Sequence, residues 1–305
     1  MTNQELTELI LKEKQKRGIK ILAHTYQNPE IIDIADVTGD SYALSVAATK
    51  LDCDTVLMCG VRFMAETVKI LSPEKKVILS HKNAGCPMAE QLKKEQIEAY
   101  KAEHPDHLVV AYINTTASLK SVCDVCVTSS SAIRIVEKLP NKDILFIPDQ
   151  NLGTFVKNQL PDKNIHLMNG CCPTHNQIMP EDVLELKKLH PNAKVAMHPE
   201  CRPETVALAD YVGATSGIID YTMATDDEVI IATERGVYDY IIEKNPDKKV
   251  YQLAPKKLVC QDMKYTTLQC VYDCIMGNSG DVIEMDENLR QLAKRPIDNM
   301  LKYGG

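Results

Sequence analysis

The 305-residue sequence has no excess of basic residues, since 35 lysines and arginines stand against 42 aspartates and glutamates, giving a formal net charge of −7. Binding to a nucleic-acid backbone depends on a basic surface, so no nucleic-acid partner is expected. No apolar run approaches the ~18 residues of a membrane span. Residues 1–16 are polar and charged, unlike a signal peptide. We therefore expect no membrane association and a cytoplasmic location.

Cysteine, in contrast, is abundant. Eleven cysteines are many for a cytoplasmic protein, and an odd number cannot all form disulfides. Some are expected to be metal ligands or reactive thiols, and the others small buried hydrophobic residues. Cys123 and Cys126 form a C-x-x-C pair without a second pair to complete a zinc site. Cys270 and Cys274 fall in a helical pattern, which favours packing.

An internal repeat organises the chain. One landmark is a polar ring after a short apolar run, and Tyr112 lies 88 residues after His24, with His198 a further 86 residues on. A second landmark is a cysteine after a later apolar run, found at Cys86, Cys172 and Cys260, with offsets of 86 and 88 residues. Because two landmarks share one period, we infer three copies of one unit.

Each copy alternates helical and strand-like patterns. The expected first helices are residues 4–16, 88–102 and 181–189. The expected strands are residues 20–26, 55–58 and 73–79 in the first copy, 108–114, 143–147 and 161–167 in the second, and 194–200, 228–232 and 246–252 in the third. This order predicts an α/β fold of three repeated αβα units with small parallel sheets around a pseudo-threefold axis. The expected boundaries are residues 1–87, 88–173, 174–260, and a helical tail at 261–305 that closes the site, with 286–303 as a closing helix.

Functional groups of open parallel sheets gather beyond the carboxyl ends of the strands. His24, Tyr112, His198 and the three period-related cysteines all follow expected strand ends. If the units pack around one axis, the thiolates of these cysteines converge and could hold a 4Fe-4S cluster by three of its irons. The open fourth iron indicates Lewis-acid catalysis rather than electron transfer.

Hydroxyl residues open a further helical pattern in each copy. They are Ser41, Ser129 and Thr215, within Gly39–Ser41, Thr128–Ser131 and Gly213–Ser216. Their default role is helix capping. The free N–H groups of a helix N-terminus also suit carboxylates and phosphates, so we expect substrate anions here. Ser216 is the alternative to Thr215.

Several short motifs, in order between residues 20 and 265, together resemble the quinolinate synthase A family. They are His24-Thr-Tyr26-Gln27, Gly39-Asp-Ser41, Asn83-Ala-Gly-Cys86, Tyr112-Ile-Asn114, Cys126-Val-Thr-Ser129, Gly170-Cys-Cys172-Pro-Thr-His175, His198-Pro-Glu200 and Cys260-Gln-Asp-Met263. Each motif is modest alone, and the set is highly specific.

The resemblance implies condensation of iminoaspartate with dihydroxyacetone phosphate to quinolinate, phosphate and two waters, in NAD biosynthesis. It implies a 4Fe-4S cluster on Cys86, Cys172 and Cys260, with Cys171 as the rival for the second ligand. The implied substrate-binding residues are His24, Ser41, Tyr112, Asn114, Ser129, His198 and Thr215. Tyr26 and Glu200 resemble the acid-base residues, with His198 beside them.

The resemblance also implies a supplier of unstable iminoaspartate, an aspartate oxidase or dehydrogenase. Two other types of triplicated iron-sulfur enzyme remain as alternatives: the terminal reductase of the non-mevalonate isoprenoid pathway and the diphthamide-forming radical enzymes. An iron-sulfur or zinc sensor is the non-enzymatic alternative, although no recognition helix for an output surface is visible.

Overall fold

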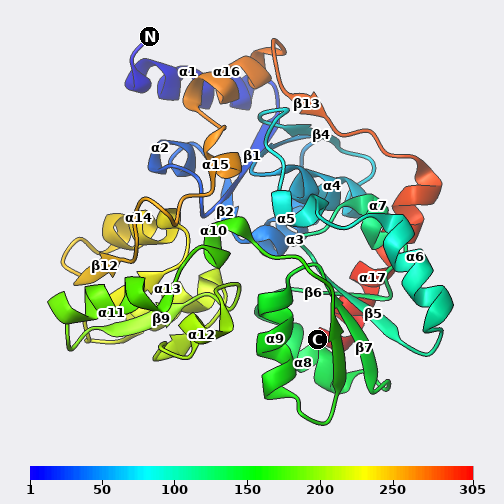
Figure 1. The fold of residues 1–305 in the computed structure, drawn as a ribbon. Helices are drawn as coiled ribbons and strands as arrows, with labels where there is room; N and C mark the ends of the chain where they lie inside the picture. The colour runs from blue at the N-terminus through cyan, green and yellow to red at the C-terminus, as the bar shows by residue number, and fades with distance from the viewer. Residues whose placement is uncertain (305) are drawn as a thin grey trace. The chain divides into compact units, whose positions relative to one another are not determined.

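The computed structural model describes residues 1–304 and contains three sheets of mainly parallel strands (Figure 1). The first sheet contains β1 (Ile19–His24), β2 (Val37–Gly39), β3 (Thr55–Cys59), β4 (Lys76–Leu79) and β13 (Asp281–Val282), in the order β13-β4-β3-β1-β2. The second contains β5 (Leu108–Tyr112), β6 (Val125–Val127), β7 (Asp143–Ile147) and β8 (Asn164–Leu167), in the order β6-β5-β7-β8. The third contains β9 (Lys194–Met197), β10 (Tyr211–Val212), β11 (Val229–Ala232) and β12 (Val250–Gln252), in the order β10-β9-β11-β12.

Each repeat contributes five helices in the same order. The first has α1 (Asn3–Lys16), α2 (Pro29–Ile32), α3 (Ser41–Lys50), α4 (Arg62–Leu71) and α5 (Pro87–Glu90). The second has α6 (Lys94–Glu103), α7 (Ala117–Lys120), α8 (Ala132–Lys138), α9 (Gln150–Gln159) and α10 (Pro173–Asn176). The third has α11 (Pro180–Leu189), α12 (Pro203–Val206), α13 (Thr215–Ala224), α14 (Arg235–Lys244) and α15 (Gln261–Lys264), and α16 (Leu268–Met276) and α17 (Glu287–Gly304) follow. The predicted α/β class and its three repeats are confirmed.

The repeat is richer than its sequence pattern predicted. Each copy adds a short strand, which is β2, β6 or β10, and a short helix, which is α2, α7 or α12. The helix expected at residues 88–102 is wrong as one element, because α5 ends at Glu90 and α6 begins at Lys94. Between them, the Gln91 side chain bonds the backbone of Cys171, donating to its carbonyl at 3.0 Å and accepting from its N–H at 2.8 Å.

The tail also differs from the expected run of helices. It supplies β13, which pairs antiparallel with β4 and was not predicted. An ion pair accompanies this pairing, because the Arg62 guanidinium lies 2.5 Å from the Asp281 carboxylate. The helix expected at residues 286–303 is present as α17. None of the helices in the described part of the chain has the length and hydrophobicity needed to cross a membrane.

By its contacts the chain forms two compact units. One contains residues 1–86 with 260–294, and the other contains residues 87–259 and the chain from Arg295 onward. In the first unit, α1 and α16 lie side by side and share a core with β1 and β3 (Figure 1). In the second unit, the third sheet has its own core around Val195, Met197 and Ile230, which also buries Cys201. The second unit therefore holds the second repeat and the third repeat up to Val259, whereas Cys260 and α15 of the third repeat belong to the first unit.

An aspartate before the second strand of each repeat is a third period-related landmark, which the sequence analysis missed. Its N–H and its carboxylate both bond one residue of the first strand, at 2.8–2.9 Å in every case. The pairs are Asp36 with Ile21, Asp124 with Val109, and Asp210 with Val195. These bonds fix where the second strand starts, beside the carboxyl half of the first.

Replacing Asp36 with asparagine tests this landmark. Burial alone raises the pKa of the Asp36 carboxyl, but the Ile21 N–H and the ammonium groups of Lys14 and Lys20 outweigh burial and lower it. Because the folded pKa lies below the unfolded one, the carboxylate stabilises the fold above pH ~4, and this contribution is lost as pH falls through the folded pKa. The variant should lose about 1 kcal/mol of unfolding free energy at pH 7 and less at pH 3.

Urea unfolding of both proteins in the same cofactor state measures this difference. Asp33→Asn is the control, because Asp33 is exposed at the end of α2. A loss of stability for Asp36→Asn that is as large at pH 3 as at pH 7 would contradict the electrostatic explanation.

Candidate active site

One main-chain hydrogen bond positions the cysteine-bearing loop of each repeat. The first N–H of the fourth helix donates to the carbonyl two residues before the cysteine. The three bonds are Arg62 to Ala84 at 2.8 Å, Gln150 to Gly170 at 2.7 Å, and Arg235 to Leu258 at 2.8 Å. The loops of Cys86, Cys172 and Cys260 are therefore built alike.

Each of these three cysteines also directly precedes the short fifth helix of its repeat, and each is half-buried. Cys171 stands one residue before the equivalent position, and its backbone bonds the Gln91 side chain. Burial raises the pKa of the Cys171 thiol, and the Asp149 carboxyl adds to this effect. Of the two neighbours, Cys172 is thus the structural counterpart of Cys86 and Cys260.

Five other thiols are buried, and burial raises the pKa of each: Cys59, Cys123, Cys126, Cys201 and Cys274. The Cys123 thiol donates to the Leu119 carbonyl at 3.1 Å, and the pKa of Cys126 rises to about 11. Both residues are free thiols in the second unit. Their burial and the raised pKa values, which disfavour the thiolate that binds metal, both favour a packing role for these cysteines.

Asp149 fixes the loop of Cys172. It is fully buried at the N-terminus of α9, and its carboxylate accepts hydrogen bonds from the N–H groups of Leu152 and Cys172, both at 2.8 Å. Burial and the nearby Glu200 carboxylate raise the pKa of Asp149 well above its usual value. Of these two carboxyl groups, Asp149 is therefore the one that more readily holds a proton.

The same loop approaches Pro148 so closely that only glycine fits at position 170. A Cβ there would lie 2.3 Å from the Pro148 carbonyl oxygen. Gly170→Ala should therefore displace the Cys172 loop, costing about 1–3 kcal/mol of unfolding free energy, and, if Cys172 holds iron, it should lower the iron bound per chain. Thermal unfolding and iron analysis check both effects. Ala84→Gly is the control at the equivalent position, and equal iron in both variants would contradict this role for Gly170.

Glu200 and His175 form a buried pair beside Cys172. The Glu200 carboxylate lies 2.9 Å from His175 Nδ1, and Nδ1 lies 3.3 Å from the Cys172 sulfur. The opposite ring nitrogen is 3.0 Å from the Thr233 hydroxyl. Donation from Nδ1–H to the carboxylate leaves Nε2 to accept from Thr233. The cysteine, imidazole and carboxylate atoms lie within 4.8 Å of one another, close enough to share one metal ion.

Glu200 keeps its charge despite complete burial. Burial raises the pKa of its carboxyl, but the charge that His198 carries at low pH and hydrogen bonds from His175 and Tyr112 outweigh burial and lower the pKa below its usual range, and at neutral pH the hydrogen bonds support the carboxylate. Tyr112 ends β5 and His198 follows β9, so residues from two sheets converge on this carboxylate. A buried carboxylate with this support can accept a proton from a bound substrate.

His198 is held as a neutral ring. Burial lowers its pKa to about 4. Its Nδ1 accepts from the Glu200 N–H at 3.3 Å, which places the ring proton on Nε2. His24 makes the equivalent hydrogen bond in the first unit, because its Nδ1 accepts from the N–H of the residue two positions later, Tyr26, at 3.1 Å. Both histidines can therefore donate an Nε2–H to a carboxylate or phosphate oxygen.

Asn114 follows Tyr112 in a loop that a buried lysine supports. The Lys120 ammonium is fully buried and donates to the carbonyls of Ile113, at 2.8 Å, and Thr115. Thr115 in turn donates to the Tyr112 carbonyl at 2.7 Å. The loop is thus fixed on both sides of Asn114, whose side chain is half-buried.

Three hydroxyl residues lie at helix N-termini as expected, but their predicted role as caps is wrong. Ser41 and Thr215 are the first residues of α3 and α13, after the N-cap residues Asp40 and Ala214. Ser129 lies ahead of α8, in a turn closed by bonds between Thr128 and Ser131. The Asp40 carboxylate caps α3 by accepting from the Ala43 N–H at 2.9 Å, whereas Ala214 has no side-chain group that caps α13.

Comparison with known proteins assigns the chain to a family. The family model for quinolinate synthetase A protein matches residues 8–302. A quinolinate synthase from Caldicellulosiruptor bescii is 46% identical over 305 residues, which is 100% of both chains. Those of Clostridium acetobutylicum and Clostridioides difficile are 44% identical over 304 residues and 46% over 301, covering 99% and 98% of each chain. The chain belongs to the quinolinate synthetase A family.

Within this member of the quinolinate synthetase A enzyme family, the second unit brings together Tyr112, Cys172, His198 and Glu200. The first unit holds His24 beside Tyr26, with ring centroids 4.5 Å apart, and Lys264 donates to the Tyr26 carbonyl at 2.5 Å. Cys86 and Cys260 also belong to this unit.

Sequence reasoning missed four residues of the second unit. They are Asp149, His175 as a partner of Glu200, Thr233 and Lys120. The C-P-T-H motif was a usable signal for His175, because a histidine three residues after a cysteine on a short helix lies on the same side of the turn. No spacing pattern pointed to the others.

Proposed function

We propose that this chain is a quinolinate synthase that condenses iminoaspartate with dihydroxyacetone phosphate, releasing phosphate and two waters. One observation carries the proposal: a charged carboxylate, Glu200, lies buried among Tyr112, His175 and His198, directly beside the half-buried Cys172. Joining two carbonyl-derived fragments into an aromatic ring requires proton transfers at carbon and removal of two waters, without net electron transfer. A buried base with neighbouring donors suits these steps.

We further propose that Cys86, Cys172 and Cys260 bind a 4Fe-4S cluster. The fit rests on their shared loop geometry, on their half-burial and on their equivalent positions directly before the fifth helix of each repeat. When bound, such a cluster supplies a Lewis-acidic iron that eases the departure of a hydroxyl group as water. A reductase would need a partner protein that supplies electrons. The proposed condensation involves no net electron transfer and needs no such partner.

The chain's own residues account for binding and proton transfer. Neutral His24 and His198 donate Nε2–H groups to substrate oxygens, and Tyr112 and Asn114 orient the same ligand. The N-terminal turns at Ser41, Ser129 and Thr215 offer hydroxyl and N–H donors to the carboxylates and the phosphate. Glu200 accepts protons released during ring formation, and Tyr26 returns a proton to a leaving oxygen.

The proposal includes a supply partner and a compartment. Iminoaspartate is unstable in water, so an aspartate oxidase or dehydrogenase must produce it nearby, and we place the enzyme in the cytoplasm. Both proposals are supported by the chemical instability of iminoaspartate, by the family to which the chain belongs and by its acidic composition.

The deciding experiment is an assay under anaerobic conditions. Protein purified without oxygen is analysed for iron and sulfide and then given dihydroxyacetone phosphate with freshly generated iminoaspartate. Quinolinate should form only when both substrates and the cluster are present, and one phosphate should be released per quinolinate. Fully loaded protein that forms no quinolinate would overturn the proposal and favour the sensor or reductase alternatives.

A further inference from the structure

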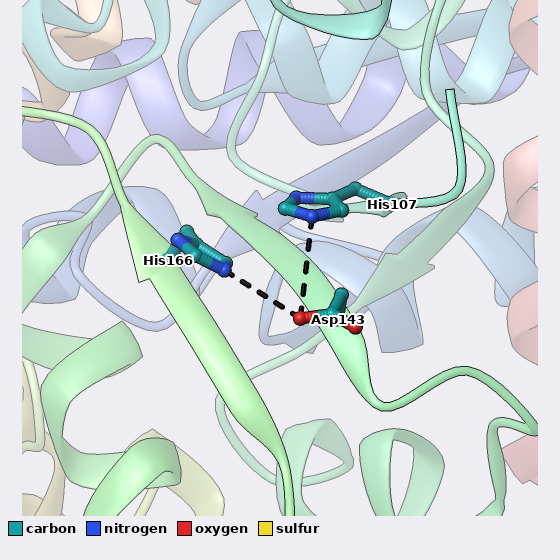
Figure 2. A group of neighbouring side chains, drawn as sticks. All are labelled: His107, Asp143 and His166. Atoms are coloured by element: carbon teal, nitrogen blue, oxygen red, sulfur yellow. Dashed lines mark ion pairs between the residues drawn. The ribbon is translucent and has the colours of Figure 1, made fainter. Parts of the chain in front are cut away.

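Two histidines and an aspartate meet at the amino-terminal edge of the second sheet (Figure 2). His107 immediately precedes β5, Asp143 is the first residue of β7, and His166 lies on β8. The Asp143 Oδ1 atom is 4.0 Å from His107 Nε2 and 3.8 Å from His166 Nε2. All three potential ligand atoms lie within 4.8 Å of one another.

This cluster is separate from the candidate active site. Tyr112 occupies the carboxyl end of β5, whereas His107 stands just before the amino end of the same strand. Strands of a parallel sheet start at one edge and end at the other, so the cluster and Tyr112 lie at opposite edges of the second sheet. None of its residues serves the proposed reaction.

The His166 side chain gives the main evidence for a missing ligand. Its Nε2 atom is buried and, among residues 1–304, has no hydrogen-bond partner. The Asp143 oxygen at 3.8 Å is too distant for a hydrogen bond. Buried polar atoms nearly always have a partner, so an imidazole nitrogen that faces a carboxylate oxygen without bonding it indicates a missing group between them. The His166 side chain is 40% exposed overall, which leaves the site accessible from solvent.

The surrounding residues orient the cluster as metal sites require. His107 Nδ1 lies 2.8 Å from the Tyr100 hydroxyl, which accepts the Nδ1 proton when Nε2 is a ligand. Asn164 donates to Asp143 Oδ1 at 2.6 Å. The His107 ring stacks on His166, with centroids 4.7 Å apart. Both imidazoles and the carboxylate are therefore held by further contacts.

The repeats show that the fold does not need this cluster. The strand register places Thr55 and Ile78 of the first repeat where Asp143 and His166 stand in the second. In the third repeat the equivalents are Glu228 and Tyr251, and the tyrosine hydroxyl donates directly to the carboxylate at 3.1 Å. In the second repeat two polar groups face each other at this register, 3.8 Å apart and without a direct hydrogen bond.

We propose that His107, Asp143 and His166 bind a divalent transition-metal ion of the zinc type. Two imidazole nitrogens and a carboxylate oxygen are suitable ligands for such an ion, which leaves a position for water. Ligands on tetrahedral zinc lie about 3.4 Å apart, so small side-chain rotations close the nitrogen–oxygen gaps. The bound ion ties the loop before β5 to β7 and β8.

Isothermal titration of anaerobic, cluster-loaded protein with Zn²⁺ tests the proposal, because the loaded cluster protects its cysteine ligands. The wild type should bind one ion that His166→Ile and Asp143→Thr lose. These variants take the residues of the first repeat, and a thermal melt verifies their fold. Tyr100→Phe should weaken binding by about 10- to 100-fold, as expected when a ligand loses its orienting contact.

His190→Ala is the matched control. His190 stacks on Tyr251 in the third repeat, at a centroid distance of 3.4 Å, and should not affect zinc binding. Zinc binding that is equal in His166→Ile and wild type, absent from the wild type, or lost in His190→Ala overturns the proposal. Quinolinate formation is recorded separately, so failure of the metal site is distinguishable from failure of the proposed reaction.

Discussion

Replacing Glu200 with glutamine is expected to lower kcat for quinolinate formation by about 100- to 10,000-fold, the usual cost of losing a general base. The amide keeps the shape of the side chain and can still accept hydrogen bonds from Tyr112 and His175. It cannot take up a proton at neutral pH, whereas the low pKa of Glu200 keeps the native carboxylate ionised. Steady-state kinetics at matched iron content measure the effect.

Glu204→Gln is the control for this variant. Glu204 is the second residue of α12 and makes an exposed ion pair with Arg202 at 3.8 Å. It should retain wild-type kcat. A Glu200→Gln enzyme within about threefold of wild type would be a loss of less than 1 kcal/mol in the barrier, too little for a base. The proton acceptor would then have to be sought elsewhere.

Cys172→Ala is expected to abolish both the visible absorption of the cluster and quinolinate formation, whereas Cys171→Ala should retain both. The two thiols are adjacent in the chain, but only Cys172 occupies the loop position shared with Cys86 and Cys260. Removing one of three thiolate ligands leaves an iron of the cluster without its protein anchor. Iron and sulfide analysis of anaerobically purified variants checks the expectation.

The same analysis on Cys86→Ala and Cys260→Ala separates two kinds of metal site. A three-cysteine cluster requires all three variants to lose iron. Retention of iron in these two, with loss in Cys172→Ala, would instead indicate a single ion on Cys172, His175 and Glu200, whose ligand atoms lie within 4.8 Å of one another. Loss in Cys171→Ala alone would reverse the assignment of the second ligand.

The fold could be predicted from sequence because the pattern of each main element occurs three times, so each copy could be checked against the other two. The first strands were expected at residues 20–26, 108–114 and 194–200, and β1, β5 and β9 lie there. Short elements escaped prediction: β10 has only two residues, and its position depends on the Asp210 bonds to Val195 rather than on an apolar pattern. A two-residue strand carries too little periodicity to be recognised.

The candidate site was less accessible to sequence reasoning. Cys172 and His198 could be inferred because they share the repeat period, and Glu200 because it belongs to a family motif. Asp149 shows neither the repeat period nor a family motif. Its role depends on the hydrogen bond that its carboxylate accepts from the backbone N–H of Cys172, 23 positions away. His107, Asp143 and His166 come from three separate segments, and only the strand register brings them together.

The loops of the three cysteines are held by bonds between main-chain atoms, from Arg62, Gln150 and Arg235 to Ala84, Gly170 and Leu258. A backbone bond uses no side-chain atom at its two ends, so the residues at these positions can differ between the three loops, except that Gly170 is held by the close approach of the Pro148 carbonyl. Saturation mutagenesis at Ala84 should consequently tolerate any side chain that the local space admits. The three cysteine loops can therefore share one backbone geometry while carrying different side chains around it.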